Sequence, residues 1–143
     1  TPKFGCGLAQ CGACSVLLDG EEIRACVTPI EALDGKEVTT VDGLAARWAK
    51  QRNLSPEQAA QTLHPVQEAW IEEQVPQCGI CQFGMMIKIT ELLEQTSTPT
   101  DAEIKAALTT SGPSPHLCRC ASYAAILEGA HHAARLMSER TAR

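Results

Sequence analysis

The sequence of 143 residues has few aromatic side chains and no long apolar run. Phe, Trp and Tyr make up only 3% of it, so it lacks the aromatic side chains on which unpaired nucleic-acid bases stack. Its longest uncharged stretches, such as residues 75–87, contain Pro, Gln and Gly and fall short of the roughly 20 apolar residues that cross a bilayer. We therefore expect no membrane span and no stacking platform for nucleic acid.

Positive charge is also in deficit, because 12 Lys and Arg residues face 17 Asp and Glu residues and leave a net charge of -5. This balance disfavours a general surface for nucleic acid or anionic membranes. The amino end begins with Thr-Pro-Lys rather than Met, without a basic segment and an apolar stretch of the secretory kind. We expect a soluble chain of one ordinary domain or two small ones, shortened at its start.

Cysteine, in contrast, is abundant, with eight residues in the chain. An even count is compatible with a disulfide framework. However, Cys118 and Cys120 are separated by one residue, and Cys11 and Cys14 by two, so bridges within either group would close small, strained rings. Disulfide frameworks also belong mostly to shorter secreted chains. Metal binding is therefore the stronger interpretation, and disulfides remain a weaker alternative.

The first four cysteines have the spacing of plant-type ferredoxins. Cys6, Cys11 and Cys14 follow a C-x4-C-x2-C pattern, and eleven residues separate Cys14 from Cys26. A [2Fe-2S] cluster needs four thiolates in a concave loop with backbone N–H groups turned toward sulfur, and glycines permit that turn: Gly5, Gly7 and Gly12. Zinc is a weaker alternative, because structural zinc sites more often show two C-x2-4-C pairs.

Residues 1–43 are predicted to form a small β-rich unit. The stretch SVLLDGEEIRACV at 15–27 indicates two strands around an Asp19-Gly20 turn, with Cys26 at the end of the second strand. KEVTTV at 36–41 indicates another short strand. So few strands would leave an exposed edge and little core, so we expect further strands before residue 1 or from a partner.

From about Leu44 the apolar spacing becomes helical and predicts a four-helix bundle over residues 44–143. Ser55 with Gln58, and Thr100 with Glu103, have the spacing of capping boxes. Ser122 is expected to cap the last helix, and both Trp residues are expected to pack inside the bundle, at 48 and 70. The helical stretches cover 43–52, 55–74, 81–95, 101–108 and 123–140.

The second four cysteines lie just before two of these helices. Cys78 and Cys81 precede one, and Cys118 and Cys120 precede another. The amino ends of helices stabilise thiolates and anionic clusters, so two facing ends could hold one cluster. Taken alone, CGIC at 78–81 also resembles a thioredoxin-type dithiol, but no βαβ pattern surrounds it and two further cysteines would stay unexplained.

The segments KFGCGLAQCGACSVLLDG, QCGICQFG and CRCASY together resemble the small iron–sulfur subunit of molybdenum hydroxylases, the xanthine oxidase and aldehyde oxidoreductase family. The resemblance covers essentially the whole chain. The sequences of these segments are similar to those in the separate small subunits of bacterial enzymes such as isoquinoline 1-oxidoreductase and nicotinate dehydrogenase. The resemblance implies an α+β fold, with a ferredoxin-like β-grasp domain at 1–43 that lacks its first strands and a helical [2Fe-2S] domain at 44–143.

The resemblance further implies an electron-transfer subunit without catalytic residues of its own. Electrons would pass from the molybdenum centre of a large partner subunit, which carries molybdopterin cytosine dinucleotide, to an external acceptor such as a cytochrome c. The reaction served would be oxidation of an N-heteroaromatic or aldehyde substrate. Gln77 and Cys120 match residues that contact the pterin in the family. Two [2Fe-2S] clusters would be held by Cys6, Cys11, Cys14 and Cys26, and by Cys78, Cys81, Cys118 and Cys120.

Four histidines allow other interpretations. His116 stands where the family commonly has Asn and raises a Rieske-like ligand, but eight cysteines already complete two sets. His64 is expected to start a helix, and His131 and His132 to lie on a solvated face. Ala121 stands where Gly is common in the family.

A stand-alone ferredoxin-like carrier is the alternative function, although such a carrier needs one cluster rather than two. Because clusters are assembled in a reducing compartment, we expect a cytoplasmic protein, or a periplasmic one if it is exported with its partner.

Overall fold

A β-hairpin carries the first cysteine loop. Strands β1 (Ser15–Leu18) and β2 (Glu21–Arg24) are antiparallel and are joined by Asp19 and Gly20, whose φ angles of 50° and 96° suit the primed turns that match strand twist. Strand β3 (Val38–Thr39) pairs with the other side of β1, so the strand order is β2-β1-β3. The computed structural model describes residues 2–113 and 115–141.

The prediction that the second strand ends on Cys26 is wrong by two residues. Strand β2 ends at Arg24, and Cys26 lies in the short 3-10 turn η1 (Ala25–Val27). The chain leaves the sheet there because the Thr28 hydroxyl donates a hydrogen bond to the Arg24 carbonyl at 2.9 Å, which closes the turn. Two more 3-10 turns lead to the helices, η2 (Ile30–Leu33) and η3 (Val41–Gly43).

The stretch predicted as helical over 55–74 is two separate helices. Helix α2 ends at Ala60 and α3 begins at Pro65, because the proline ring excludes helical backbone at the preceding residue. His64 caps α3 by accepting a hydrogen bond from the Val66 N–H at 3.1 Å, which confirms its expected place at a helix start. The helices are α1 (Leu44–Gln51), α2 (Pro56–Ala60), α3 (Pro65–Glu72), α4 (Gln82–Gln95), α5 (Asp101–Thr109) and α6 (Tyr123–Thr141).

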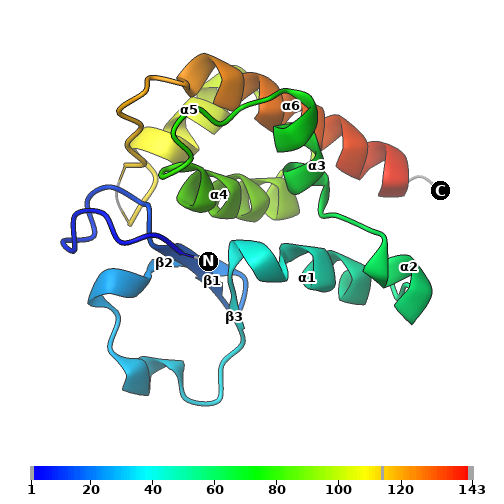
Figure 1. The fold of residues 1–143 in the computed structure, drawn as a ribbon, viewed down its shortest axis with the longest axis horizontal. Helices are drawn as coiled ribbons and strands as arrows, with labels where there is room; N and C mark the ends of the chain where they lie inside the picture. The colour runs from blue at the N-terminus through cyan, green and yellow to red at the C-terminus, as the bar shows by residue number, and fades with distance from the viewer. Residues whose placement is uncertain (1, 114, 142–143) are drawn as a thin grey trace.

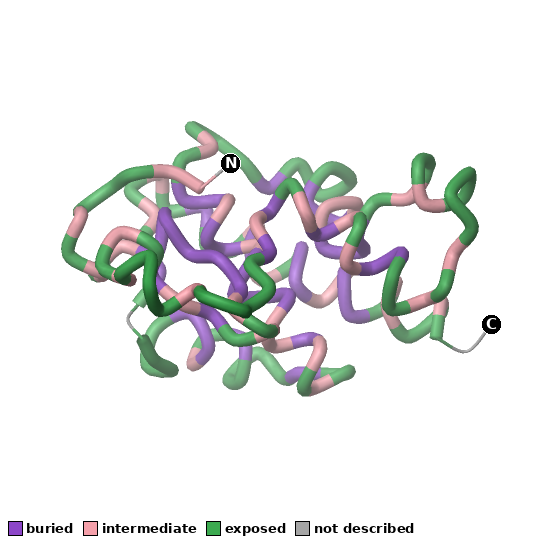
Figure 2. The backbone as a smooth tube through the Cα atoms, turned by 90° about the horizontal axis from the view of Figure 1, so that it is seen from below, coloured by how far each residue is buried: buried purple, intermediate pink, exposed green. Residues whose placement is uncertain are grey.

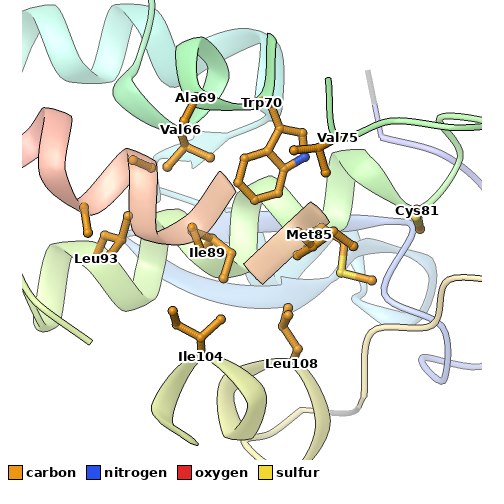
Figure 3. Packing of buried hydrophobic residues seen from close by; sticks show 14 residues of the cluster. Val66, Ala69, Trp70, Val75, Cys81, Met85, Ile89, Leu93, Ile104 and Leu108 are labelled. Carbon is orange, nitrogen blue, oxygen red and sulfur yellow. The ribbon is translucent and has the colours of Figure 1, made fainter. Parts of the chain in front are cut away.

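Four of these helices, α3 to α6, form the predicted bundle around a shared apolar cluster. Figure 3 shows Trp70 of α3 above Met85 and Ile89 of α4, with Ile104 and Leu108 of α5 on the opposite side. The capping boxes predicted at 55 and 100 start α2 and α5. Trp48 was expected in the bundle but lies outside this cluster, because α1 runs beside the sheet.

Helix α4 is the central element, since it contacts the sheet on one side and the other bundle helices on the other. Leu17 of β1, Leu44 of α1 and Ile87 of α4 form a second, smaller core cluster with Val41. Figure 2 shows these buried stretches in the interior and exposed loops around them. The expected α+β class is confirmed. The division at residues 43 and 44 coincides with the start of α1 and stays a prediction.

None of the helices in residues 2–113 and 115–141 combines the length and the apolar content that a membrane crossing would need.

Candidate metal centres

The loop before β1 turns several backbone N–H groups toward sulfur, as its glycines predicted. Gln10 and Leu8 donate to the Cys6 Sγ at 3.2 and 3.3 Å, and Cys6 donates to the Cys11 Sγ at 3.4 Å. The backbone hydrogen bonds from Leu8 and Gln10 lower the pKa of the Cys6 thiol to about 7. The loop therefore stabilises negative charge on a sulfur atom before any ligand is considered.

Within this first set, two thiols each have a cysteine neighbour. Cys6 interacts with Cys11, and Cys14 interacts with Cys26 across the hairpin. Burial raises the pKa of the Cys14 thiol, whereas hydrogen bonds lower that of Cys6, so these two thiols differ in acidity. Gly5 leaves room beside them, because a Cβ atom at that position would lie 2.6 Å from the Cys11 Sγ.

The second set gathers at the amino ends of α4 and α6, as predicted. Cys81 is the residue before α4 and interacts with both Cys118 and Cys78, while Cys120 interacts with Cys78. Burial raises the pKa of the Cys81 thiol to about 12. Cysteines that are 42 positions apart in sequence thus meet at one place.

Two polar side chains form hydrogen bonds with sulfur atoms of this second set, and the sequence analysis predicted neither contact. Ser122 was expected only as a cap, but its hydroxyl lies 3.1 Å from the Cys118 Sγ. Burial acts to raise the pKa of Cys118, but hydrogen bonds from the side chain and backbone of Ser122 outweigh it and lower that pKa. Gln82 donates to the Cys81 Sγ at 3.1 Å while its carbonyl oxygen accepts from Trp70 Nε1 at 2.8 Å.

The two cysteine sets are neighbours. The Leu117 N–H donates to the Cys11 carbonyl at 3.0 Å, which joins the first loop to the residue that precedes Cys118. Figure 1 shows the same contact as the blue amino-terminal loop beside the yellow and orange segment before α6. A cavity of about 620 Å³ lies between them and is lined by thiols of both sets, from Cys6, Cys11, Cys78, Cys81 and Cys118.

The close approach of the loop to α4 depends on Gly84. A Cβ atom there would lie 1.8 Å from the Gly12 carbonyl oxygen, so no larger residue fits without movement of the loop.

A separate cavity of about 790 Å³ near Trp48 and Arg52 is lined by none of the eight cysteines.

Gln77, which the resemblance implies as a pterin contact, is exposed directly before Cys78. Cys120 is half-buried, and Ala121 beside it has a φ of 58°, a left-handed conformation that glycine adopts more readily.

Three of the four histidines lie beside carboxylates. His116 is buried, and its Nε2 lies 3.0 Å from a Glu22 carboxylate oxygen. Its burial lowers its pKa. The expectation of a solvated face at His131 and His132 is only partly right, because both rings pair with carboxylates across helices: His131 with Asp101 and His132 with Glu73, each at 2.7 Å.

All eight cysteines are free thiols in the structure. Over residues 2–113 and 115–141, no three His, Cys, Asp or Glu side chains converge closely enough to enclose a single metal ion. A tetrahedral zinc site needs four ligands around one point, whereas a [2Fe-2S] cluster takes two ligands on each of two irons.

Comparison with known proteins agrees with this chemistry. The [2Fe-2S] binding domain family matches residues 40–131. The chain is 42% identical to the alpha subunit of isoquinoline 1-oxidoreductase from Brevundimonas diminuta, over 93% of this chain and 75% of that protein. It is 39% identical to one of the subunits of nicotinate dehydrogenase from Pseudomonas putida, over 93% and 73%.

The fold matches the crystal structure of quinoline 2-oxidoreductase from Pseudomonas putida 86 with a TM-score of 0.77 and 26% identity, over 96% of this chain and 75% of that one. Sequence, fold and thiol arrangement thus agree, and the chain belongs to the small [2Fe-2S] iron–sulfur subunits of the molybdenum hydroxylase, or xanthine oxidase, family.

Proposed function

We propose that this chain relays electrons from the molybdenum centre of a large partner subunit to an external acceptor, through two [2Fe-2S] clusters. The reaction served is the oxidation of an N-heteroaromatic or aldehyde substrate. The observation that carries the proposal is that segments of the two four-cysteine sets adjoin, through the Leu117–Cys11 hydrogen bond and a cavity lined by cysteines of both sets. A stand-alone carrier has no need of a second set.

The proposed ligands are the eight thiols. Bound there, the clusters supply one-electron redox chemistry. The chain's own contribution is to hold thiolates in place and to direct N–H groups and Ser122 toward them, because hydrogen bonds to sulfur raise the reduction potential of such sites. The first cluster would be held by Cys6, Cys11, Cys14 and Cys26, and the second by Cys78, Cys81, Cys118 and Cys120.

A short bonded route supports a relay in series. From Cys11 the route runs through its own carbonyl, across the 3.0 Å hydrogen bond to the Leu117 N–H, and then along the chain to Cys118. Only one step of that route is not covalent.

The surface near the second set supports a permanent partner. Ile80 and Leu117 lie close to the thiols and are 50% and 53% exposed, and exposed apolar side chains at such a place favour a lasting protein interface. We propose that the large subunit binds here, with its molybdopterin cytosine dinucleotide near Gln77 and Cys120. Electrons then leave from the first set to an acceptor such as a cytochrome c, in the cytoplasm, or in the periplasm if the complex is exported.

Metal analysis tests the proposal directly. We expect about four iron atoms and four acid-labile sulfides per chain, because each [2Fe-2S] cluster contains two of each. The reduced protein should give two distinct electron paramagnetic resonance signals, and it should co-purify with a larger molybdenum-containing chain. Zinc in place of iron, or a single cluster signal, would refute it.

The direction of transfer is tested by two matched variants within that complex. Cys120→Ser should mainly impair electron entry, whereas Cys11→Ser should leave reduction of molybdenum by substrate intact and block exit to the acceptor. If rapid-reaction spectroscopy shows both variants stopping at the same step, the proposed order is wrong.

A further inference from the structure

A buried ionic network joins the segments that carry the two cysteine sets, and neither set includes any of its members. Its centre is Glu22 of β2, whose side chain is fully buried. One carboxylate oxygen of Glu22 accepts from the Ser15 hydroxyl at 2.5 Å and lies 3.0 Å from His116 Nε2 and 3.4 Å from Arg24 Nη1. Because the neighbour of Nε2 is a carboxylate, that nitrogen of His116 is the donor.

The other Glu22 oxygen faces α4. Lys88 Nζ lies 3.3 Å from it, and the same ammonium donates to Glu91 at 2.6 Å and to the Gly112 carbonyl at 3.1 Å. Glu91 in turn accepts from the Glu22 backbone N–H at 2.7 Å. The two carboxylates are thus balanced by the side chains of Lys88 and Arg24.

Each member lies next to a segment that carries cysteines. Ser15 follows Cys14, Arg24 lies two residues before Cys26, and His116 lies two residues before Cys118. Lys88 is on α4, whose amino end carries Cys81. The network therefore joins both cysteine loops to one helix, and the Leu117–Cys11 hydrogen bond lies beside it in sequence.

Stability alone does not explain such a network. Removing charges from water costs free energy, and buried ion pairs can often be replaced by apolar packing without loss of stability. Directional hydrogen bonds among several charged groups instead hold the segments they join in one defined arrangement.

We propose that Glu22 is a positioning residue that fixes the first cysteine loop against residues 115–118 and so sets the electronic coupling between the two clusters. This inference rests on the proposed function, since it requires two clusters. Glu22 touches none of the eight thiols through any of the contacts above, so its effect reaches the clusters only through the segments it holds.

The test uses Glu22→Gln in the full chain loaded with iron and sulfide. Gln keeps the size of the side chain but places an amide where Lys88 or Arg24 needs a carboxylate. We expect the variant to retain iron and both paramagnetic resonance signals, but to lose the magnetic splitting that two nearby reduced clusters impose on each other. Hydrogen exchange at the Leu117 amide should become about tenfold faster, because its hydrogen bond loses support.

The matched control is Glu94→Gln, which removes a partly buried carboxylate from α4, the helix whose Lys88 pairs with Glu22. Glu94 pairs with Arg47 at 2.8 Å, away from the cysteine loops. This variant should leave the splitting and the Leu117 exchange rate as in the wild type. Loss of the splitting in the control as well would overturn the proposal, because the loss of a partly buried carboxylate away from the cysteine loops would then suffice.

A double variant separates positioning from stability and carries the test if the single variant does not fold. Glu22→Gln combined with Lys88→Met removes one charge of each sign, so thermal stability should recover while the splitting stays absent. Recovery of the splitting together with stability would overturn the proposal.

Wild-type protein without two interacting signals would instead refute the proposed function. If the wild type shows the splitting and both Glu22 variants keep it, the positioning role alone is wrong.

Discussion

The contact between α4 and the first cysteine loop predicts how Gly84→Ala changes the stability of the protein. Two opposing effects act at this position, and the larger one decides whether the substitution stabilises or destabilises it. Gly84 lies in the first turn of α4, where helix propensity favours Ala over Gly by up to about 1 kcal/mol. Propensity alone therefore predicts that Gly84→Ala stabilises the protein. The new Cβ atom, however, would lie 1.8 Å from the Gly12 carbonyl oxygen and 2.7 Å from its carbon.

An ordinary contact would require the loop backbone to move by about 1.5 Å, and the neighbours of the Gly12 carbonyl leave little freedom for that. The Ser15 N–H donates a hydrogen bond to it at 3.1 Å, and the Ser15 hydroxyl oxygen lies 2.8 Å from it. Overpacking of this kind costs about 3 kcal/mol, so the net effect is a loss of about 2 kcal/mol. For a chain of this size the melting temperature should fall by about 5 to 10 °C.

The assay is thermal unfolding followed by circular dichroism, with iron content measured on the same samples. Gly84→Ala should melt earlier and bind less iron, because the displaced backbone lies between Cys11 and Cys14. Gly43→Ala is the control, since its Cβ atom would meet only a methyl group at 3.4 Å and its φ of -84° suits any residue. An unchanged or higher melting temperature for Gly84→Ala, with full iron content, would refute the packing argument.

Two further predictions concern single polar contacts. Burial lowers the pKa of His64 to about 4 from its ordinary 6.5, so the imidazole binds a proton more tightly in the unfolded chain than in the folded one. The free energy of unfolding is therefore at its full value above pH 6.5 and falls by up to about 3 kcal/mol as the pH drops toward 4. His64→Asn keeps a capping side chain and should flatten urea-unfolding free energies across that range; an unaltered slope would contradict the assignment. Ser122→Ala removes the hydroxyl beside Cys118. Because one hydrogen bond contributes about 1 kcal/mol, a redox titration should show the reduction potential of the second cluster lowered by about 40 mV. A shift in the potential of the first cluster instead would contradict the arrangement.

Features encoded by neighbours in sequence were predictable. The two cysteine sets, the Asp19-Gly20 turn and the capping boxes at Ser55 and Thr100 each depend on a few consecutive residues, and the structure shows the turn and both caps where they were expected. The local effect of Pro65 could also have been used, because a proline inside a helical pattern ends the helix before it.

Features that depend on long-range packing were not predictable. Nothing near Glu22 in the sequence shows that it meets His116, 94 positions later, or that α1 carries Trp48 away from the bundle. One signal was present, since Lys88 interrupts the apolar spacing of α4 and a buried lysine requires a partner. Its partner could be identified only once β2 and α4 were seen together.

The two cysteine sets also differ in how much of the chain each one needs. Cys6 to Cys26 lie within 21 consecutive residues, whereas Cys78 to Cys120 are brought together only after α4, α5 and α6 have packed. Short-range closure is faster than long-range closure, and amino-terminal segments leave the ribosome first. During biosynthesis the amino-terminal loop, with all four ligands of the first proposed cluster, can therefore be complete before the helical half has finished folding.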